Sequence, residues 1–237
     1  MILIIGGFGG SVEYMRAFAA LLKPVVVVSL LHGVGLAQEC ARINAIIERE
    51  APDAIIAFST GCVVACSCDL PAGCRLVLCN PPEIASRKIL RFMTYVAPRT
   101  ILSVTWDATR WLLGSEAMAQ WYYWLHGAVV NEPRPDELAR VVFARSLADL
   151  LTTLQTCLLE PGVRPMFDVV KRGVCRVDVL IGEGDPYQHV AHALCEAGGA
   201  SVRLHRVAGG DHHMLYHMPE VCADRVKVLL GWFTLAL

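Results

Sequence analysis

Short apolar runs recur near both ends of the chain, and most are followed by a turn rich in glycine, serine or proline. Runs with little alternation between apolar and polar residues are typical of strands buried on both faces of a sheet. Segments between them carry apolar residues every three or four positions, the spacing of an amphipathic helix. Strands and helices that alternate in this way predict βαβ units and a parallel sheet. The predicted strands cover residues 2–5, 24–30, 54–58, 75–79, 177–181 and 201–207.

The alternation stops between residues 83 and 170, where helical spacing occurs together with aromatic residues and without a strand pattern. We therefore predict a core formed by residues 1–84 and 171–237, interrupted by a helical lid or cap at residues 85–170. Aromatic side chains in such a segment either fill its own core or line an apolar substrate pocket, and the pattern leaves both open. The candidates are Trp106, Trp111, Trp121, Tyr122 and Trp124.

The chain of 237 residues is long enough for one α/β domain with a sizeable core and an insertion. It carries 21 Lys and Arg against 22 Asp and Glu, so its charge gives no indication of a nucleic-acid partner. Hydrophobic residues make up 55% of the chain, yet the longest uncharged stretches, such as 24–38 and 54–68, have 15 residues each. Because a membrane-spanning helix needs roughly 18 or more, we predict no membrane span.

The first five residues lack the basic stretch, the long apolar run and the cleavage site of a secretory signal. The ten cysteines suit a reducing compartment in which cysteine serves as a small core residue, so we predict a cytoplasmic protein. Five of them lie between residues 62 and 79 without the paired Cys-x2-Cys spacing of zinc sites, and the histidines near residue 212 lack the His-Glu-x-x-His pattern. We predict neither a metal nor another cofactor, and the oligomeric state stays open.

Residues 57–61, Ala-Phe-Ser-Thr-Gly, lie where a buried strand is expected to turn into a buried helix. A nucleophile elbow needs small residues two positions before and after its serine, because the strand and helix backbones nearly touch there. Its serine adopts a strained backbone conformation that lifts the hydroxyl above the sheet. An ordinary turn whose serine caps the helix has the same composition, so the pentapeptide alone leaves both interpretations of Ser59 open.

Residues 6–11, Gly-Gly-Phe-Gly-Gly-Ser, follow the first predicted strand. Glycines let a backbone approach a ligand closely, which suits a phosphate cradle or a loop that donates a backbone N–H to an oxyanion. The segment lacks the Gly-Lys-Ser/Thr of a P-loop, and a plain turn remains the third interpretation. As an oxyanion loop it would use the N–H of Phe8.

An acid and a histidine follow two further predicted strands. Asp185 lies in Gly-Glu-Gly-Asp-Pro after the strand at 177–181, and His212 lies in Gly-Gly-Asp-His after the last strand. Carboxyl ends of parallel strands share one edge of a sheet, so both are expected near Ser59. Glu183 is a second candidate acid and His213 a second candidate base; the motif register favours Asp185 and His212.

Together, these four segments resemble those of α/β-hydrolases, which use the same chain order of serine, acid and histidine. The resemblance implies an α/β-hydrolase fold, a mostly parallel sheet flanked by helices with a helical lid insertion. It also implies a nucleophile at Ser59, a general base at His212 and a carboxylate at Asp185 that orients the histidine. The backbone N–H groups of Phe8 and Thr60 would form the oxyanion hole.

Within that superfamily, the sequence is most similar to the thioesterases of polyketide and nonribosomal peptide biosynthesis. The likeness lies in Gly-Asp-His followed by Met-Leu and in a last helix that begins with Pro-Glu. Phe58 and Cys62 depart from it, since His or Trp and then Gly are more usual there. Thioesterase domains often carry their acid after the strand that follows the elbow, which here is predicted at 75–79. In this sequence that position holds Asn80, with Glu83 further on, and this favours Asp185 as the acid.

The resemblance implies cleavage of acyl thioesters, carried by a carrier protein or coenzyme A, through an acyl-enzyme that ends in hydrolysis, transfer or cyclisation. The expected partners are a small-molecule acyl substrate and an acyl carrier protein that presents it. Hydrolysis of small esters, lactones or C–C bonds would use the same three residues, and the aromatic insertion favours an apolar acyl group without identifying the leaving group. A catalytically idle fold used for binding is the remaining alternative, and the complete triad argues against it.

Overall fold

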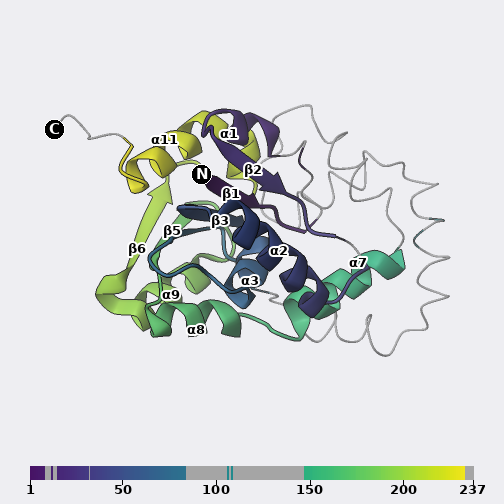
Figure 1. Ribbon diagram of the computed structural model, residues 1–237. Coiled ribbons are helices and arrows are strands. Elements are labelled where there is room, and N and C mark those ends of the chain that lie inside the picture. The colour runs from purple at the N-terminus through teal and green to yellow at the C-terminus, as the bar shows by residue number, and fades with distance from the viewer. Residues whose placement is uncertain are drawn as a thin grey trace.

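The computed structural model describes residues 1–8, 12, 15–31, 33–83, 106, 108 and 147–232. Within them, six strands form one parallel sheet in the order β2-β1-β3-β4-β5-β6 (Figure 1). The predicted parallel α/β architecture is therefore confirmed. The strands are β1 (Ile2–Ile5), β2 (Val25–Val28), β3 (Ala54–Phe58), β4 (Arg75–Cys79), β5 (Arg176–Gly182) and β6 (Val202–Val207).

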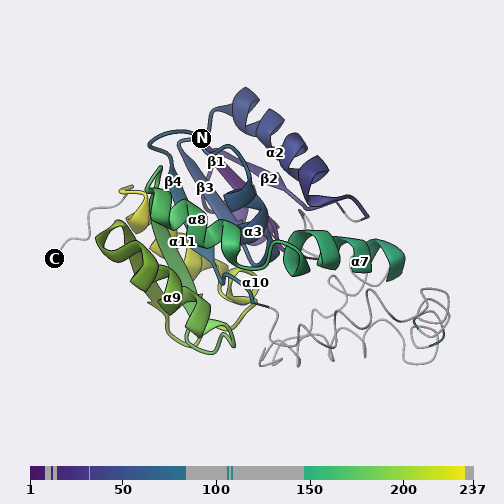
Figure 2. The same cartoon turned by 90° about the horizontal axis from the view of Figure 1, so that it is seen from below.

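Helices cover both faces of the sheet, which explains why its central strands are apolar on both sides. Helices α3, α8 and α9 cover one face of the sheet, which is seen from below in Figure 2. Helices α1 and α11 cover the opposite face (Figure 1). No helix of the described residues is long and apolar enough to cross a membrane. The described helices are α1 (Arg16–Ala20), α2 (Leu36–Glu50), α3 (Thr60–Ser67), α7 (Leu147–Leu154), the π-helix η2 (Gln155–Leu159), α8 (Arg164–Arg172), α9 (Gln188–Gly198), the 3₁₀-helix η3 (Gly199–Ser201), α10 (Met214–His217) and α11 (Pro219–Leu229).

Alternate side chains of each central strand enter two separate hydrophobic cores. In β3, Ile55 and Ala57 face the core beneath α2, α3, α8 and α9, whereas Ile56 and Phe58 face the core beneath α1, α10 and α11. All four side chains are buried. Burial on both faces contributes about 25 cal/mol per Å² of apolar surface, which holds the strand ends in place beneath the loops.

The register of the ladders brings four loops to the same edge. Phe58 pairs with Cys79, Cys79 pairs with Leu180, and Gly182 pairs with Val207. Hence the segments after β3, β4, β5 and β6 all begin at neighbouring points of the carboxyl edge. This is the edge at which open α/β sheets bind their ligands.

Glycines allow backbone segments to touch at this edge. A Cβ added to Gly61, at the start of α3, would lie 2.5 Å from the carbonyl oxygen of Gly6. A Cβ on Gly182, at the end of β5, would overlap the carbonyl oxygen of Gly210 in the loop after β6. The size requirement predicted around Ser59 thus has a direct structural cause at Gly61.

The predicted insertion at residues 85–170 is described only in part. Trp106 is partly buried and packs against the core beneath α1, α10 and α11, whereas Trp111, Trp121, Tyr122 and Trp124 lie outside the described residues. The lid therefore stays a prediction.

The boundary predicted between residues 170 and 171 falls inside α8. The buried side chains of α8 are Met166, Val169 and Val170, and they belong to the same core as α3 and α9. The core on this side therefore begins before residue 171. The spacing of apolar residues along a helix does not by itself indicate which surface the helix covers.

We expect Gly182→Ala to lower the free energy of unfolding by about 2 kcal/mol or more, because the new methyl group would push the loops after β5 and β6 apart. Gly35→Ala is the matched control: Gly35 has ordinary backbone angles and nothing within 4 Å of an added Cβ. Gly35→Ala should lower the free energy of unfolding by less than about 1 kcal/mol. Urea unfolding of both variants measures the difference, and equal midpoints would refute the steric argument.

Candidate active site

Ser59 lies between the end of β3 and the first residue of α3, with φ 51° and ψ −125°. An L-residue rarely adopts such a backbone, which costs on the order of 1–3 kcal/mol, and the elbow hypothesis predicts this strain. The Ser59 N–H donates to the carbonyl of Cys79 at 3.0 Å and so secures the turn to β4. The side chain makes no capping hydrogen bond to α3, a helix that the structure describes throughout. The turn is therefore not a simple serine N-cap.

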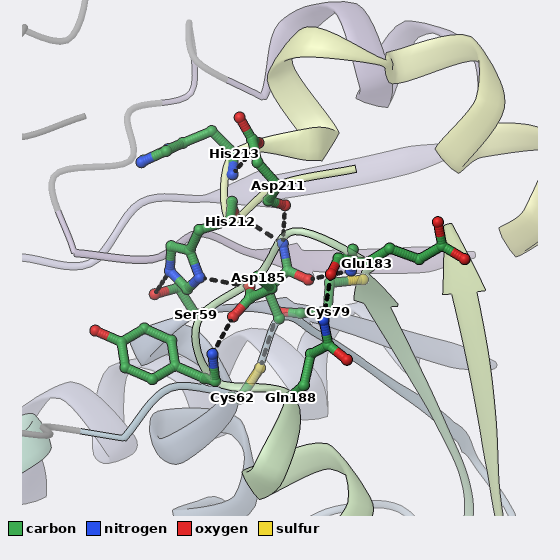
Figure 3. Close-up of polar contacts among 12 residues, drawn as sticks. Ser59, Cys62, Cys79, Glu183, Asp185, Gln188, Asp211, His212 and His213 are labelled. Carbon is green, nitrogen blue, oxygen red and sulfur yellow. Dashed lines mark hydrogen bonds and ion pairs between the residues drawn. The ribbon is translucent and has the colours of Figure 1, made fainter. Parts of the chain in front are cut away.

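Instead, the Ser59 hydroxyl is hydrogen-bonded to the imidazole of His212. Ser59 Oγ lies 2.9 Å from His212 Nε2, and His212 Nδ1 lies 2.8 Å from Asp185 Oδ2 (Figure 3). All three residues are buried: 9% of the surface of Ser59, 2% of His212 and 3% of Asp185 is exposed. Because an ionised carboxylate only accepts hydrogen bonds, His212 carries its proton on Nδ1 and donates it in a hydrogen bond to Asp185. The unprotonated Nε2 can then accept a hydrogen bond from the Ser59 hydroxyl. The structure thus brings together three residues that are far apart in sequence.

The carboxylate of Asp185 is held on both of its oxygens. Oδ2 faces His212, while Oδ1 accepts a hydrogen bond from the backbone N–H of Tyr187 at 2.6 Å. The ring of Tyr187 meets the His212 ring edge-on, with centroids 5.3 Å apart, and Phe58 lies on another side at 5.6 Å. Burial, followed by the negative charge of Asp185, raises the pKa of the Tyr187 phenol, so this ring stays neutral. The sequence contained no signal for Tyr187.

The side chain of His213 points in a different direction from that of His212. The two rings are nearly perpendicular, at 89°, and the side chain of His213 points away from Ser59 (Figure 3). The Asp211 carboxylate shapes this loop, accepting the His213 N–H at 2.7 Å and lying 3.2 Å from His217 Nδ1. Of the two candidate bases, His212 is the one that the structure places beside Ser59.

The other candidate acids lie elsewhere. Glu183 is exposed in the turn after β5, and its side chain points away from His212 (Figure 3). Glu83, in the loop after β4, pairs with His189 at 2.7 Å near the molecular surface. Of the three acids considered, Asp185 is therefore the one hydrogen-bonded to His212.

The two predicted oxyanion donors belong to segments next to Ser59: Thr60 follows it in the chain, and Phe8 lies in the loop after β1. Thr60 is the first residue of α3, where backbone N–H groups are not used within the helix and the helix dipole favours negative charge. Phe8 follows Gly7, and a Cβ added to Gly7 would lie 2.9 Å from Ser59 Cβ. The missing side chain of Gly7 lets the loop after β1 reach the elbow, and Phe8 is the next residue of that loop.

The cysteines near the elbow pack as core residues. The thiol of Cys62 is 3.2 Å from the carbonyl oxygen of Ala57, and burial raises the pKa of this thiol, which keeps it protonated and unreactive. Cys79 is buried beside it with a pKa raised for the same reason. Among the described residues, no group of three or more His, Cys, Asp or Glu side chains is arranged to hold a metal ion.

A parallel sheet with helices on both faces, and a hydrogen-bonded serine, histidine and acid in the loops after β3, β6 and β5, is the architecture of α/β-hydrolases. Residues 2–225 match the family model described as the alpha/beta hydrolase family. The chain belongs to this family of hydrolase-type enzymes.

Solved structures of several hydrolases are similar to this chain. MenH from S. aureus has 12% identity and a TM-score of 0.73, over 98% of this chain and 94% of that one. A carboxylesterase from the thaumarchaeon Nitrososphaera gargenis has 15% identity and a TM-score of 0.68, over 98% and 89%. The thioesterase domain from the curacin biosynthetic pathway has 12% identity and a TM-score of 0.58, over 95% and 90%. At these identities the likeness shows the fold alone, and no curated protein sequence matches.

We expect Asp185→Asn to lower kcat on the order of 10⁴-fold, because an amide in this position favours the wrong tautomer of His212. The charge-matched controls Glu83→Gln and Glu183→Gln should stay close to wild type in kcat. Steady-state kinetics on an activated ester measures all three. A loss at Glu83 or Glu183 comparable to the loss at Asp185 would overturn the assignment of the acid.

Proposed function

We propose that the protein is a serine hydrolase that cleaves acyl thioesters through an acyl-enzyme on Ser59. The observation that carries this proposal is the buried chain from Ser59 Oγ through His212 to Asp185, with distances of 2.9 and 2.8 Å. A serine hydroxyl is a weak nucleophile unless a base within hydrogen-bond reach takes its proton. His212 has the position, the tautomer and the carboxylate partner for that task.

In the acylation step, Ser59 Oγ attacks the acyl carbonyl while its proton passes to His212 Nε2. The tetrahedral intermediate then breaks its bond to the leaving group, which takes the proton from His212 and departs as a thiol. Asp185 stabilises the imidazolium that exists between these two transfers. Such base catalysis contributes typically 10²–10⁴-fold.

The negative oxygen of the intermediate would be held by the backbone N–H groups of Thr60 and Phe8. One such donor contributes about 3–4 kcal/mol where it has been removed in other enzymes. Deacylation repeats the sequence with water, whose proton goes to His212 and whose oxygen forms the released acid. Another nucleophile in place of water would give transfer or cyclisation.

An apolar acyl group suits the apolar surroundings of the elbow. Phe8 and Trp106 both pack against the core beneath α1, α10 and α11, on the side of the sheet to which Phe58 belongs. A thioester is favoured by the resemblance of the loop at 209–215 to that of biosynthetic thioesterases. We further propose that an acyl carrier protein or coenzyme A supplies the acyl group, and that the enzyme works in the cytoplasm, where its ten free thiols would persist.

A fluorophosphonate probe tests the nucleophile. We expect it to label the wild-type protein and to leave Ser59→Ala unlabelled, as read by intact-protein mass spectrometry. His212→Ala should label on the order of 10²–10⁴-fold more slowly, because Ser59 loses its base. His213→Ala is the matched control and should label at nearly the wild-type rate. An unlabelled wild type would favour the idle binding protein, and equal labelling of Ser59→Ala would refute the elbow.

The leaving group is tested by comparing thioesters and oxoesters of the same acyl chain. We expect the larger kcat/KM for the thioester, with a further gain when the acyl group is presented on a carrier protein. Ser59→Ala supplies the background rate for both substrates. Faster cleavage of the oxoester, or of a lactone or C–C bond substrate, would contradict the thioesterase proposal while leaving the serine hydrolase intact.

A further inference from the structure

Asn80 lies at the centre of the site without touching the reacting atoms. It follows β4, is completely buried, and has a φ of 48°, a left-handed conformation that asparagine tolerates better than most residues. Its backbone N–H donates to the carbonyl of Leu180 at 2.9 Å, which pins it to β5. The backbone of Asn80 is therefore anchored to the sheet.

The side-chain amide of Asn80 bridges two loops of the site. Nδ2 donates one hydrogen to the carbonyl of Asp211 at 2.9 Å and the other to the carbonyl of His212 at 2.8 Å. Oδ1 accepts the backbone N–H of Gly182 at 3.0 Å. Turning the amide over would place its oxygen against two carbonyls and its nitrogen against an N–H, so only this orientation satisfies all partners.

These contacts join the histidine to its acid. Asn80 holds the carbonyl of His212 itself on one side and Gly182, three residues before Asp185, on the other. The preceding residue, Cys79, accepts the N–H of Ser59 through its carbonyl at 3.0 Å. Two consecutive residues thus contact the segments that carry all members of the proposed triad.

We propose that Asn80 is a positioning residue that sets the distance between His212 and Asp185, and thereby the orientation of the imidazole toward Ser59. This inference deepens the proposed function and rests on it for its kinetic consequences. The amide acts through the backbone of His212 and contacts neither Ser59 Oγ nor the ring nitrogens. An aspartate has the same shape but offers only acceptors to the two carbonyls, which would repel it.

Asn80→Asp is the decisive variant. We expect kcat to fall on the order of 10²-fold with KM near the wild-type value, because a small displacement of the base slows the chemical step without changing binding. In a His212→Ala background, Asn80→Asp should cause no further loss of kcat, since Asn80 acts through His212. An equal loss in both backgrounds would mean a general structural role and would overturn the proposal.

A second measurement needs no turnover. The Nδ1 proton of His212 should give a downfield NMR signal that disappears in His212→Ala, and we expect this signal to be lost or shifted in Asn80→Asp. Asn44→Asp is the matched control: Asn44 also hydrogen-bonds through both ends of its amide, to Asp69, but at the surface between α2 and the end of α3. It should leave both the signal and kcat unchanged.

The outcomes separate the two proposals. If the wild type neither reacts with the probe nor hydrolyses esters, the proposed function fails, and the NMR signal still decides the positioning by Asn80. A folded Asn80→Asp protein with an unchanged signal and unchanged kcat would overturn the positioning alone. If Asn80→Asp does not fold, Asn80→Ser, which removes the bridge without adding a charge, is measured in the same way.

Discussion

Backbone segments meet at the carboxyl edge of the sheet with no room for a side chain between them, and the rest of the site depends on this close approach. Gly7 lies against Ser59, Gly61 against the end of β1, and Gly182 against Gly210. Each contact shortens the distance between two loops by roughly the thickness of a side chain. Buried strands with apolar residues on both faces hold the loops there, so the strain at Ser59 is supported by two cores.

Close packing creates a second requirement, because polar groups removed from water need partners. A buried amide or carboxylate without a hydrogen bond costs on the order of 1–3 kcal/mol or more. Asp185 meets this requirement with His212 and the N–H of Tyr187, and Asn80 meets it with two carbonyls and one N–H. The same hydrogen bonds that satisfy buried groups also fix the geometry on which a proton relay depends.

Much of this arrangement was predictable from the sequence. Apolar runs predict the parallel sheet, and Ser59, Asp185 and His212 each follow a predicted strand in a turn of suitable composition. At Asn80 the sequence indicates only that the strand at 75–79 is not followed directly by an acid. Its role as a bridge depends on carbonyl groups of residues 211 and 212, more than 130 positions away, and no local pattern reports such a contact.

The sequence by itself determined the class of fold and the chemical identity of the candidate site, because strand period, turn composition and chain order are local or linear properties. The motif register favoured one histidine and one acid among neighbouring candidates, but only the tertiary structure shows which of them lie next to Ser59. His212 rather than His213 faces Ser59, and Asp185 rather than Glu183 or Glu83 faces His212, because side-chain direction depends on how two loops pack against one another. It likewise placed α8 in the core, since the surface that a helix covers is set by distant elements.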